Sequence, residues 1–388
     1  MRTAITAKRL WDGARLVDDP LVVIEDGRIG HIGTRGDCEV PAGAQVVDFP
    51  GATLAPALLD VHIHGGAGHD VMEATSEALN TIGRFLGAHG TGGYLATTVT
   101  APLDVTLKAL SGLAKLLSQA PQTGQARPLG IHLEGPFLSH AKRGAHPAEY
   151  LLPPDISTFN RLCEAAEGHV RLMTLAPELP GAAELAAHAT AGGVRVSVGH
   201  SNATAAETRA TIAAGAVSAT HTFNAMRPLD HREPGILGTV LTTDALYAEM
   251  ICDGIHAAPE MVRLWWKAKG PARAILITDA LSAAGMPDGE YQLGGMTVHV
   301  ADRRATLPGN VLAGSVLTLD RALANFMEFT GAELEKALGL ATANPAAMTG
   351  LEARAGAVAL GAAANLIALD EKGRLAGSVI GGQVLAGR

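Results

Sequence analysis

The sequence predicts an α/β fold: a (β/α)8 TIM-like barrel with a small β-sandwich domain formed by both chain termini. Three observations lead to this fold class. From residue 58 onward, short apolar runs typical of buried strands alternate with segments of helical pattern. Eight such runs occur, which is the number that a closed barrel requires. No Gly-x-Gly-x-x-Gly follows the first run, which disfavours the competing doubly wound sheet. The eight runs are residues 58–64, 93–99, 129–134, 170–176, 194–200, 216–222, 247–253 and 274–280.

The remaining segments support this arrangement in chain order. The first 55 residues contain short β-like pieces such as "LVVIEDGRIGHIG", in which Asp-Gly forms a turn. "TSEALNTIGRFLGAHG" has the Ser/Thr start and the Gly end of a helix. A β-rich insertion is expected at 288–310, followed by two helices ending near "ATANPAAM" and by a β-type tail that turns at Lys372-Gly373. We therefore expect residues 1–55 and 345–388 to form the small β domain, and residues 56–344 the barrel.

Composition excludes several classes of protein. The chain has 388 residues, 30 basic and 38 acidic, and no basic run, so a nucleic-acid partner is not expected. Its three cysteines are scattered and include no Cys-x-x-Cys pair, which argues against a disulfide framework. "MRTAITAKRLWDG" lacks the apolar stretch of a signal peptide, and Gly or charged residues interrupt each apolar run. A cytoplasmic protein without a membrane partner is the expectation.

Ionisable side chains occupy the ends of the predicted strands. Because the carboxyl ends of all barrel strands meet on one face, these residues should converge. On the first run, His62 and His64 are two residues apart and therefore point to the same face of the strand. Imidazoles and carboxylates that converge in this way are ligands for Zn²⁺ or a similar divalent ion. The residues are His62, His64, Glu134, His200, His221 and Asp279.

Asp279 suits a second role. A metal ion lowers the pKa of bound water toward ~7, but hydrolysis still needs a group that accepts the proton and returns it to the leaving group. A carboxylate at the eighth strand end can do both. Alternatively, Asp279 caps the following helix. Cys252, in the seventh run, is either a further ligand or a buried, unreactive thiol.

Cationic and polar groups for an anionic substrate lie in the loops beyond the strands. Arginine is well suited to bind phosphate or carboxylate, although a loop arginine can equally be solvated. His146, beyond Glu134, either leans over the site and polarises a carbonyl or lies on the loop surface. The other candidates are Asn224, Arg227, His231, Arg232 and His256.

At these motifs the sequence resembles the amidohydrolase superfamily, and more narrowly the N-acetylglucosamine-6-phosphate deacetylase family. The resemblance covers essentially the whole chain. The motifs "HLEGPF" and "THTFNAM" are specific, whereas the His-x-His pair and the terminal Asp are shared across the superfamily. The matching segments, in the family's order, are "DVHIHGG", "IHLEGPFLSHAKRGAH", "VSVGHSNAT", "THTFNAM", "ICDGIHAAPE", "LITDAL" and "LAGS".

The resemblance implies removal of acetate from the amino group of a phosphorylated amino sugar, by attack of a metal-bound hydroxide. It implies that Glu134, His200 and His221 bind the principal metal and that Asp279 is the general base and acid. His146 would assist at the acetyl carbonyl, and a homodimer is implied as well. The implied sugar-phosphate ligands are Ala145, Asn224, Ala225, Arg232, His256, Leu312, Ala313 and Gly314.

Several alternatives stay open at this point. His62 and His64 make a second metal ion bridged by Glu134 plausible, so one or two ions are expected. Zn²⁺ is the first choice, but Fe²⁺, Mn²⁺ and Co²⁺ accept the same ligands. The galactosamine epimer of the substrate, a cyclic amide and a non-catalytic sugar-phosphate sensor are the rival functions.

Overall fold

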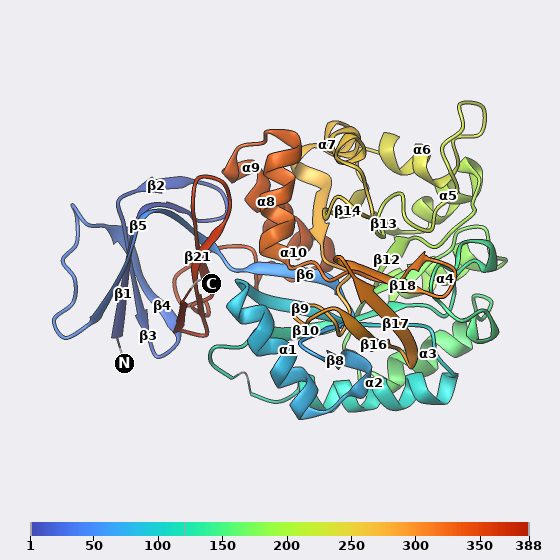
Figure 1. Cartoon of the computed structure of the whole chain (residues 1–388), viewed down its shortest axis with the longest axis horizontal. Helices are drawn as coiled ribbons and strands as arrows, with labels where there is room; N and C mark the ends of the chain where they lie inside the picture. Colours follow the sequence, from blue (N-terminus) through green and yellow to red (C-terminus); the bar gives the residue numbers. More distant parts are fainter. Residues whose placement is uncertain (1, 121, 387–388) are drawn as a thin grey trace.

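The computed structural model describes residues 2–120 and 122–386 and divides into a barrel and a smaller β-sheet (Figure 1). The smaller sheet combines the two ends of the chain, in the strand order β22-β21-β20-β5-β1-β3-β4, with β2 paired to β1. Its strands are β1 (Arg2–Trp11), β2 (Leu16–Asp18), β3 (Pro20–Glu25), β4 (Arg28–Thr34), β5 (Gln45–Pro56), β20 (Leu366–Leu369), β21 (Leu375–Ile380) and β22 (Gln383–Ala386). The β domain formed by both termini is therefore confirmed.

The barrel sheet is parallel and contains all eight predicted runs. Neighbouring strands pair in chain order, and the main chain after β15 closes the barrel onto β6: Asp279 N donates to His62 O at 2.9 Å and His64 N to Ala280 O at 2.8 Å. The (β/α)8 barrel is thus confirmed. Its strands are β6 (Leu58–Ile63), β9 (Thr91–Thr98), β10 (Arg127–Glu134), β11 (Val170–Leu175), β12 (Arg195–Val198), β13 (Ala216–Ala219), β14 (Tyr247–Ile251) and β15 (Ala274–Ile277).

Helices cover the outside of the barrel. Three of the described α-helices begin at a side-chain cap: Thr75, Asp155 and Thr204 accept hydrogen bonds from the main-chain N of Ala78, Thr158 and Glu207, respectively. None of the described helices is long and apolar enough to cross a membrane. The helices are α1 (Ser76–Ala88), α2 (Leu103–Leu117), α3 (Ile156–Ala165), α4 (Ala182–Ala191), α5 (Ala205–Ala213), α6 (Gly235–Thr242), α7 (Pro259–Arg273), α8 (Leu319–Thr330), α9 (Leu334–Leu340) and α10 (Ala343–Thr349).

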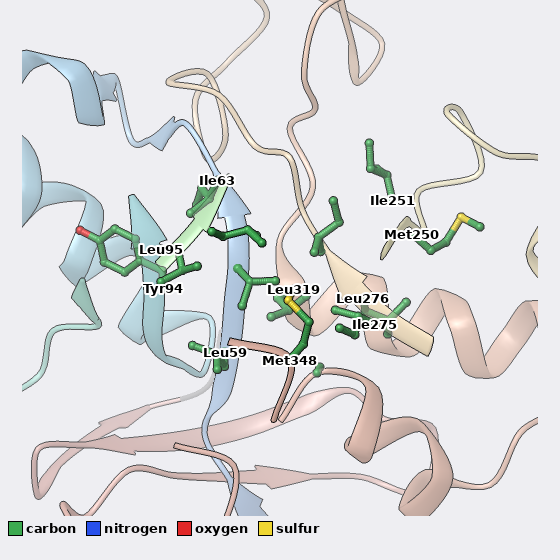
Figure 2. Close-up of a cluster of buried hydrophobic side chains, with 14 of the residues drawn as sticks. Leu59, Ile63, Tyr94, Leu95, Met250, Ile251, Ile275, Leu276, Leu319 and Met348 are labelled. Atoms are coloured by element: carbon green, nitrogen blue, oxygen red, sulfur yellow. The ribbon is translucent and has the colours of Figure 1, made fainter. Parts of the chain in front are cut away.

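Successive side chains of each barrel strand point alternately to the outside and to the inside of the barrel. On β6, Leu59 and Ile63 belong to a cluster of buried apolar side chains that also includes Leu319 of α8 and Met348 of α10 (Figure 2). Residues one position away, such as His62, face the opposite side of the strand. The apolar cluster therefore anchors the strand while its polar residues line the barrel interior.

Two features of the C-terminal third refine the sequence predictions. The predicted insertion forms a separate antiparallel sheet of β16 (Gly289–Leu293), β17 (Met296–Ala301), β18 (Arg304–Leu307) and β19 (Val311–Leu312). The prediction of two following helices was wrong: there are three. Thr342 leaves the helical region (φ −136°, ψ −81°) and separates α10 from α9. Because Ala346 and Met348 of α10 pack in the barrel's core, we propose that the small domain resumes after α10.

Candidate metal centre

Six ionisable side chains meet at the carboxyl ends of the barrel strands. All are buried. Their ligand atoms form two groups, within each of which the atoms lie no more than 4.8 Å apart: His62, His64 and Asp279 in one, and Glu134, His200 and His221 in the other. The structure therefore brings together all of the predicted metal ligands.

The local backbone explains how three of these side chains reach the centre. His200, His221 and Asp279 each lie two residues beyond the end of a strand and adopt a left-handed conformation, with φ of 45°, 27° and 52°. This region is sparsely populated by non-glycine residues and costs energy. The fold tolerates the cost where the chain turns sharply over the barrel mouth, which is a pattern typical of functional sites.

Glu134 belongs to the second group and also contacts histidines of the first. Its Oε1 is 3.3 Å from His62 Nε2, 3.2 Å from His200 Nε2 and 3.0 Å from His221 Nε2. Its Oε2 is 3.2 Å from His64 Nε2. One carboxylate thus faces all four of the predicted histidine ligands, which is the geometry of a ligand that two ions can share.

In His64 and His200, the hydrogen bond made by Nδ1 indicates whether Nε2 carries a proton or a lone pair. The Nδ1 of His64 donates to Thr97 O at 3.1 Å, and the Nδ1 of His200 donates to Lys142 O at 2.9 Å. In a neutral ring, Nε2 then carries a lone pair. In both residues Nε2 faces Glu134. A lone pair there is repelled by the carboxylate unless a metal ion or, for His64, a second proton lies between the two atoms. These residues therefore fit a bound metal ion.

Two unpartnered atoms support the same conclusion. Among the described residues, His62 Nε2 and His221 Nδ1 are buried side-chain nitrogens without a hydrogen-bond partner. Buried polar groups are seldom left unpaired, because the lost hydration costs free energy. For His62 Nε2, which points at Glu134 and Asp279, a divalent ion would supply the missing partner.

The electrostatics of the centre depend on burial and on these carboxylates. Burial disfavours the charged form of His64, but Asp279 and Glu134 outweigh it and raise its pKa to about 9. Burial lowers the pKa of His200 to about 4 despite the contact with Glu134. Burial opposes the charge of Asp279, but His62 and His64 outweigh it and lower its pKa to about 2. Asp279 is therefore ionised at neutral pH, as a base must be.

His146 lies inside the centre and not on the loop surface. It is buried, its ring packs against that of His200 at 4.6 Å, and its Nε2 is 3.4 Å from Glu134 Oε2. Its Nδ1 accepts from Thr100 N at 3.3 Å and lies 2.8 Å from Thr100 Oγ1. The neutral ring consequently carries its proton on Nε2. This is the opposite tautomer to that of His64 and His200, and it suits a hydrogen-bond donor.

The residues expected to hold a sugar phosphate are only partly gathered. His256 Nδ1 is 2.7 Å from Asp253 Oδ2. Burial opposes the charge of His256, but Asp253 outweighs it and raises the pKa of the imidazole. Asn224 is half-buried and donates to His221 O at 3.3 Å, which holds it beside the metal ligands. Arg232 is exposed, and its main-chain N–H donates to Asp230 Oδ1 at 2.8 Å. The single chain thus leaves Arg232 at the surface.

The predicted alanine and glycine contacts lie in two loops. Ala225 is half-buried, and its carbonyl accepts from Ser201 N at 3.0 Å. Ala145 packs against the small apolar cluster of the insertion. The loop of Leu312, Ala313 and Gly314 leads from the insertion back to the barrel, where Ser315 N donates to Asp279 O at 2.8 Å.

Three buried polar groups beneath the ligands escaped the sequence prediction. Glu249, in the middle of β14, has its Oε2 3.3 Å from His62 Nδ1. Asp60 accepts from Thr278 Oγ1 at 2.6 Å, and burial raises its pKa to about 7. His132 stacks edge-on against His62, with ring centroids 4.7 Å apart. The available sequence signal was a charged or ionisable residue inside an apolar strand. Cys252, by contrast, is buried outside both ligand groups.

Comparison with known proteins places this centre in a family. The amidohydrolase family pattern matches residues 53–385. The chain belongs to the amidohydrolase family. The N-acetylglucosamine-6-phosphate deacetylase of Lysinibacillus sphaericus is 37% identical over 350 residues, which cover 90% of this chain and 89% of that protein. The N-acetylgalactosamine-6-phosphate deacetylase of Escherichia coli O157:H7 is 36% identical over 370 residues, with 95% and 96% covered.

A solved structure extends the similarity to three dimensions. It is N-acetyl-D-glucosamine-6-phosphate deacetylase of Mycobacterium smegmatis, an aspartate-to-alanine mutant in complex with N-acetyl-D-glucosamine-6-phosphate. It matches this amidohydrolase with a TM-score of 0.91 and 35% identity, covering 99% of each chain. The resemblance predicted from the motifs is confirmed.

Proposed function

We propose that this amidohydrolase removes the acetyl group from N-acetylglucosamine 6-phosphate, giving glucosamine 6-phosphate and acetate. The observation that carries the proposal is the buried centre of imidazoles and carboxylates around Glu134, in a chain that matches deacetylases of this substrate over nearly its whole length. The ionised Asp279 at the centre argues against a sensor that only binds.

The donor set fits one or two divalent ions, with zinc as the first choice. Glu134, His200 and His221 would hold the principal ion. His62, His64 and Asp279 would hold a second, with Glu134 between them. When bound, such an ion polarises the acetyl carbonyl and makes water acidic enough to supply a nucleophile at neutral pH.

The chain's own residues would then move the protons. Asp279, which is ionised and within 3.1 Å of His64 Nε2, accepts the proton of the attacking water and delivers it to the departing amine. His146 presents its Nε2 proton to the acetyl oxygen, on which negative charge develops in the transition state. The backbone at Asp279 is left-handed, and its carboxylate faces His62 and His64.

The phosphate would be held by positive charge and by main-chain groups. His256, whose pKa Asp253 raises against the effect of burial, supplies donors on one side of the centre together with Asn224 and Ala225. Ala145 and the loop from Leu312 to Gly314 form the other side. We assign Arg232 to the phosphate as well; since it is exposed in the single chain, a partner subunit in a homodimer would bring it to a site.

The test follows free amine released from N-acetylglucosamine 6-phosphate by metal-replete protein, with the unphosphorylated sugar and the galactosamine epimer in parallel. Fast turnover of the phosphorylated glucosamine compound is the expected result. Equal turnover of the unphosphorylated sugar would remove the assigned phosphate ligands. Failure on all three would overturn the proposed activity.

The galactosamine epimer is the second candidate substrate, because the Escherichia coli relative carries that name at 36% identity. The two substrates differ only in the orientation of the C4 hydroxyl. A higher kcat/KM for the galactosamine compound would select it. The homodimer and the cytoplasmic location are proposals too, and light scattering with and without Arg232→Glu tests the former.

A further inference from the structure

Glu249 is a buried carboxylate that the mechanism above does not use. It lies in the middle of β14 with an exposed fraction of 0%, flanked by apolar residues. Its Oε2 is 3.3 Å from His62 Nδ1 and 3.3 Å from the main-chain N of His221. Its Oε1 has no hydrogen-bond partner among the described residues. A carboxylate in such surroundings is costly unless opposite charge compensates it.

Among the histidines of the two ligand groups, His62 is the one whose Nδ1 faces a carboxylate, that of Glu249. His64 and His200 donate their Nδ1 protons to main-chain carbonyls, which are neutral acceptors. The ring of His62 is also fixed sideways, by edge-on contacts with His132 at 4.7 Å and His64 at 5.3 Å. A carboxylate behind an imidazole fixes its tautomer and orientation and makes the opposite nitrogen a stronger donor to a metal.

We propose that Glu249 is a positioning residue that, through Nδ1 of His62, retains the second divalent ion of the centre, the one held by His62, His64 and Asp279. Nδ1–H donates to Glu249, so Nε2 is left as a lone pair aimed between Glu134 and Asp279. The ion, through the imidazole, compensates the buried charge of Glu249. The inference rests on the two-ion centre of the proposed function.

A purely structural role is the alternative, since Glu249 also accepts from the main chain of His221. The two roles respond differently to Glu249→Gln. The amide oxygen of glutamine can still accept from His62 Nδ1 and from His221 N, so the packing and both hydrogen bonds are kept. Only the negative charge is lost. A matched control is Asp60→Asn, which removes another fully buried carboxyl group of the barrel interior. With a pKa that burial raises to about 7, Asp60 is partly ionised at neutral pH, and it accepts from the main-chain N of His62 rather than from the ring of a ligand.

The experiment measures metal content and not activity alone. Wild type, Glu249→Gln and Asp60→Asn are dialysed against zinc buffered at graded free concentrations, and ions per chain are counted by mass spectrometry. Cobalt-substituted samples are examined by electron paramagnetic resonance, in which two neighbouring cobalt ions couple. We expect Glu249→Gln to bind the second ion ~10–100-fold more weakly than wild type and to lose the coupling, with the first ion unaffected. Asp60→Asn should keep both ions.

Three results with the variants would overturn the inference. Glu249→Gln could retain both ions at wild-type affinity, it could lose both ions equally, or Asp60→Asn could lose the second ion to the same extent. Wild type that binds a single ion would overturn this inference and the two-ion centre together. The proposed activity is judged separately, by turnover of N-acetylglucosamine 6-phosphate by the wild-type protein.

Discussion

Substituting Gly314 by alanine should disturb Asp279 without touching its side chain. Gly314 has φ of +64°, and a Cβ placed there would lie 3.0 Å from the main-chain oxygen of Asp279. The main-chain oxygen of Asp279 accepts a hydrogen bond from Ser315 N at 2.8 Å, and the backbone of Asp279 is itself left-handed. The methyl group therefore pushes on the peptide that carries the proposed base.

Gly314→Ala should have two separate effects: a loss of stability from the left-handed backbone and a loss of rate from the displaced carbonyl. A left-handed alanine costs roughly 1–2 kcal/mol of stability wherever it is placed. At Gly314 the carbonyl must also retreat by a few tenths of an ångström to reach ordinary contact, since 3.4 Å is the lower limit for such a pair. A misplacement of about 1 Å can cost 10²-fold in rate, so a shift of this smaller size should lower kcat roughly tenfold.

The control is Gly331→Ala at the end of α8. Gly331 has φ of +70°, and its Cβ would meet nothing within 4 Å. Both variants should lose stability in urea unfolding, but only Gly314→Ala should lose kcat at equal metal content. If the two variants keep the same kcat, the carbonyl yields without moving Asp279, and the reasoning is refuted.

Three further predictions follow from the centre. Asp279→Asn should lower kcat by about 10²–10⁴-fold, or ~3–5 kcal/mol, while substrate binding measured by calorimetry persists; near-normal turnover would contradict its role as base. His256, whose pKa is raised above 6.5 by Asp253 against the effect of burial, carries its charge below that pKa and loses it as pH rises through it. KM for the phosphorylated substrate should therefore rise with pH above ~7, where the phosphate is already ionised. Asp253→Asn should move this rise to lower pH. Identical pH profiles of KM for wild type and Asp253→Asn would contradict the prediction. Removal of metal by a chelator should lower the melting temperature, because an ion present at 100 times its Kd contributes about 2.7 kcal/mol; an unchanged melting curve would exclude a bound ion.

The fold was predictable because its pattern is repetitive and local. Eight apolar runs separated by helical segments leave few arrangements, and the carboxyl ends of parallel barrel strands must share a face. The convergence of His62, Glu134 and Asp279, more than 200 residues apart at the extremes, follows from topology alone. The helix count after the insertion did not follow from the apolar periodicity, because Thr342 breaks the helix through its backbone angles. The available local signal was Pro345, in the first turn of α10.

The chemical role of each histidine was less accessible, because sequence gives the residue type but not the partner of each ring nitrogen. His146 and His200 both follow strands of the barrel and both face Glu134. One meets Thr100, whose N–H is a donor, and the other meets the carbonyl of Lys142, which can only accept. These contacts join residues 46 and 58 positions apart and fix opposite tautomers, one presenting a proton and the other a lone pair. The same reasoning applies to Glu249, which lies 187 residues from His62. In an apolar strand a lone glutamate is a weak signal, and it acquires a role only when the barrel closes and the imidazole of β6 lies against it.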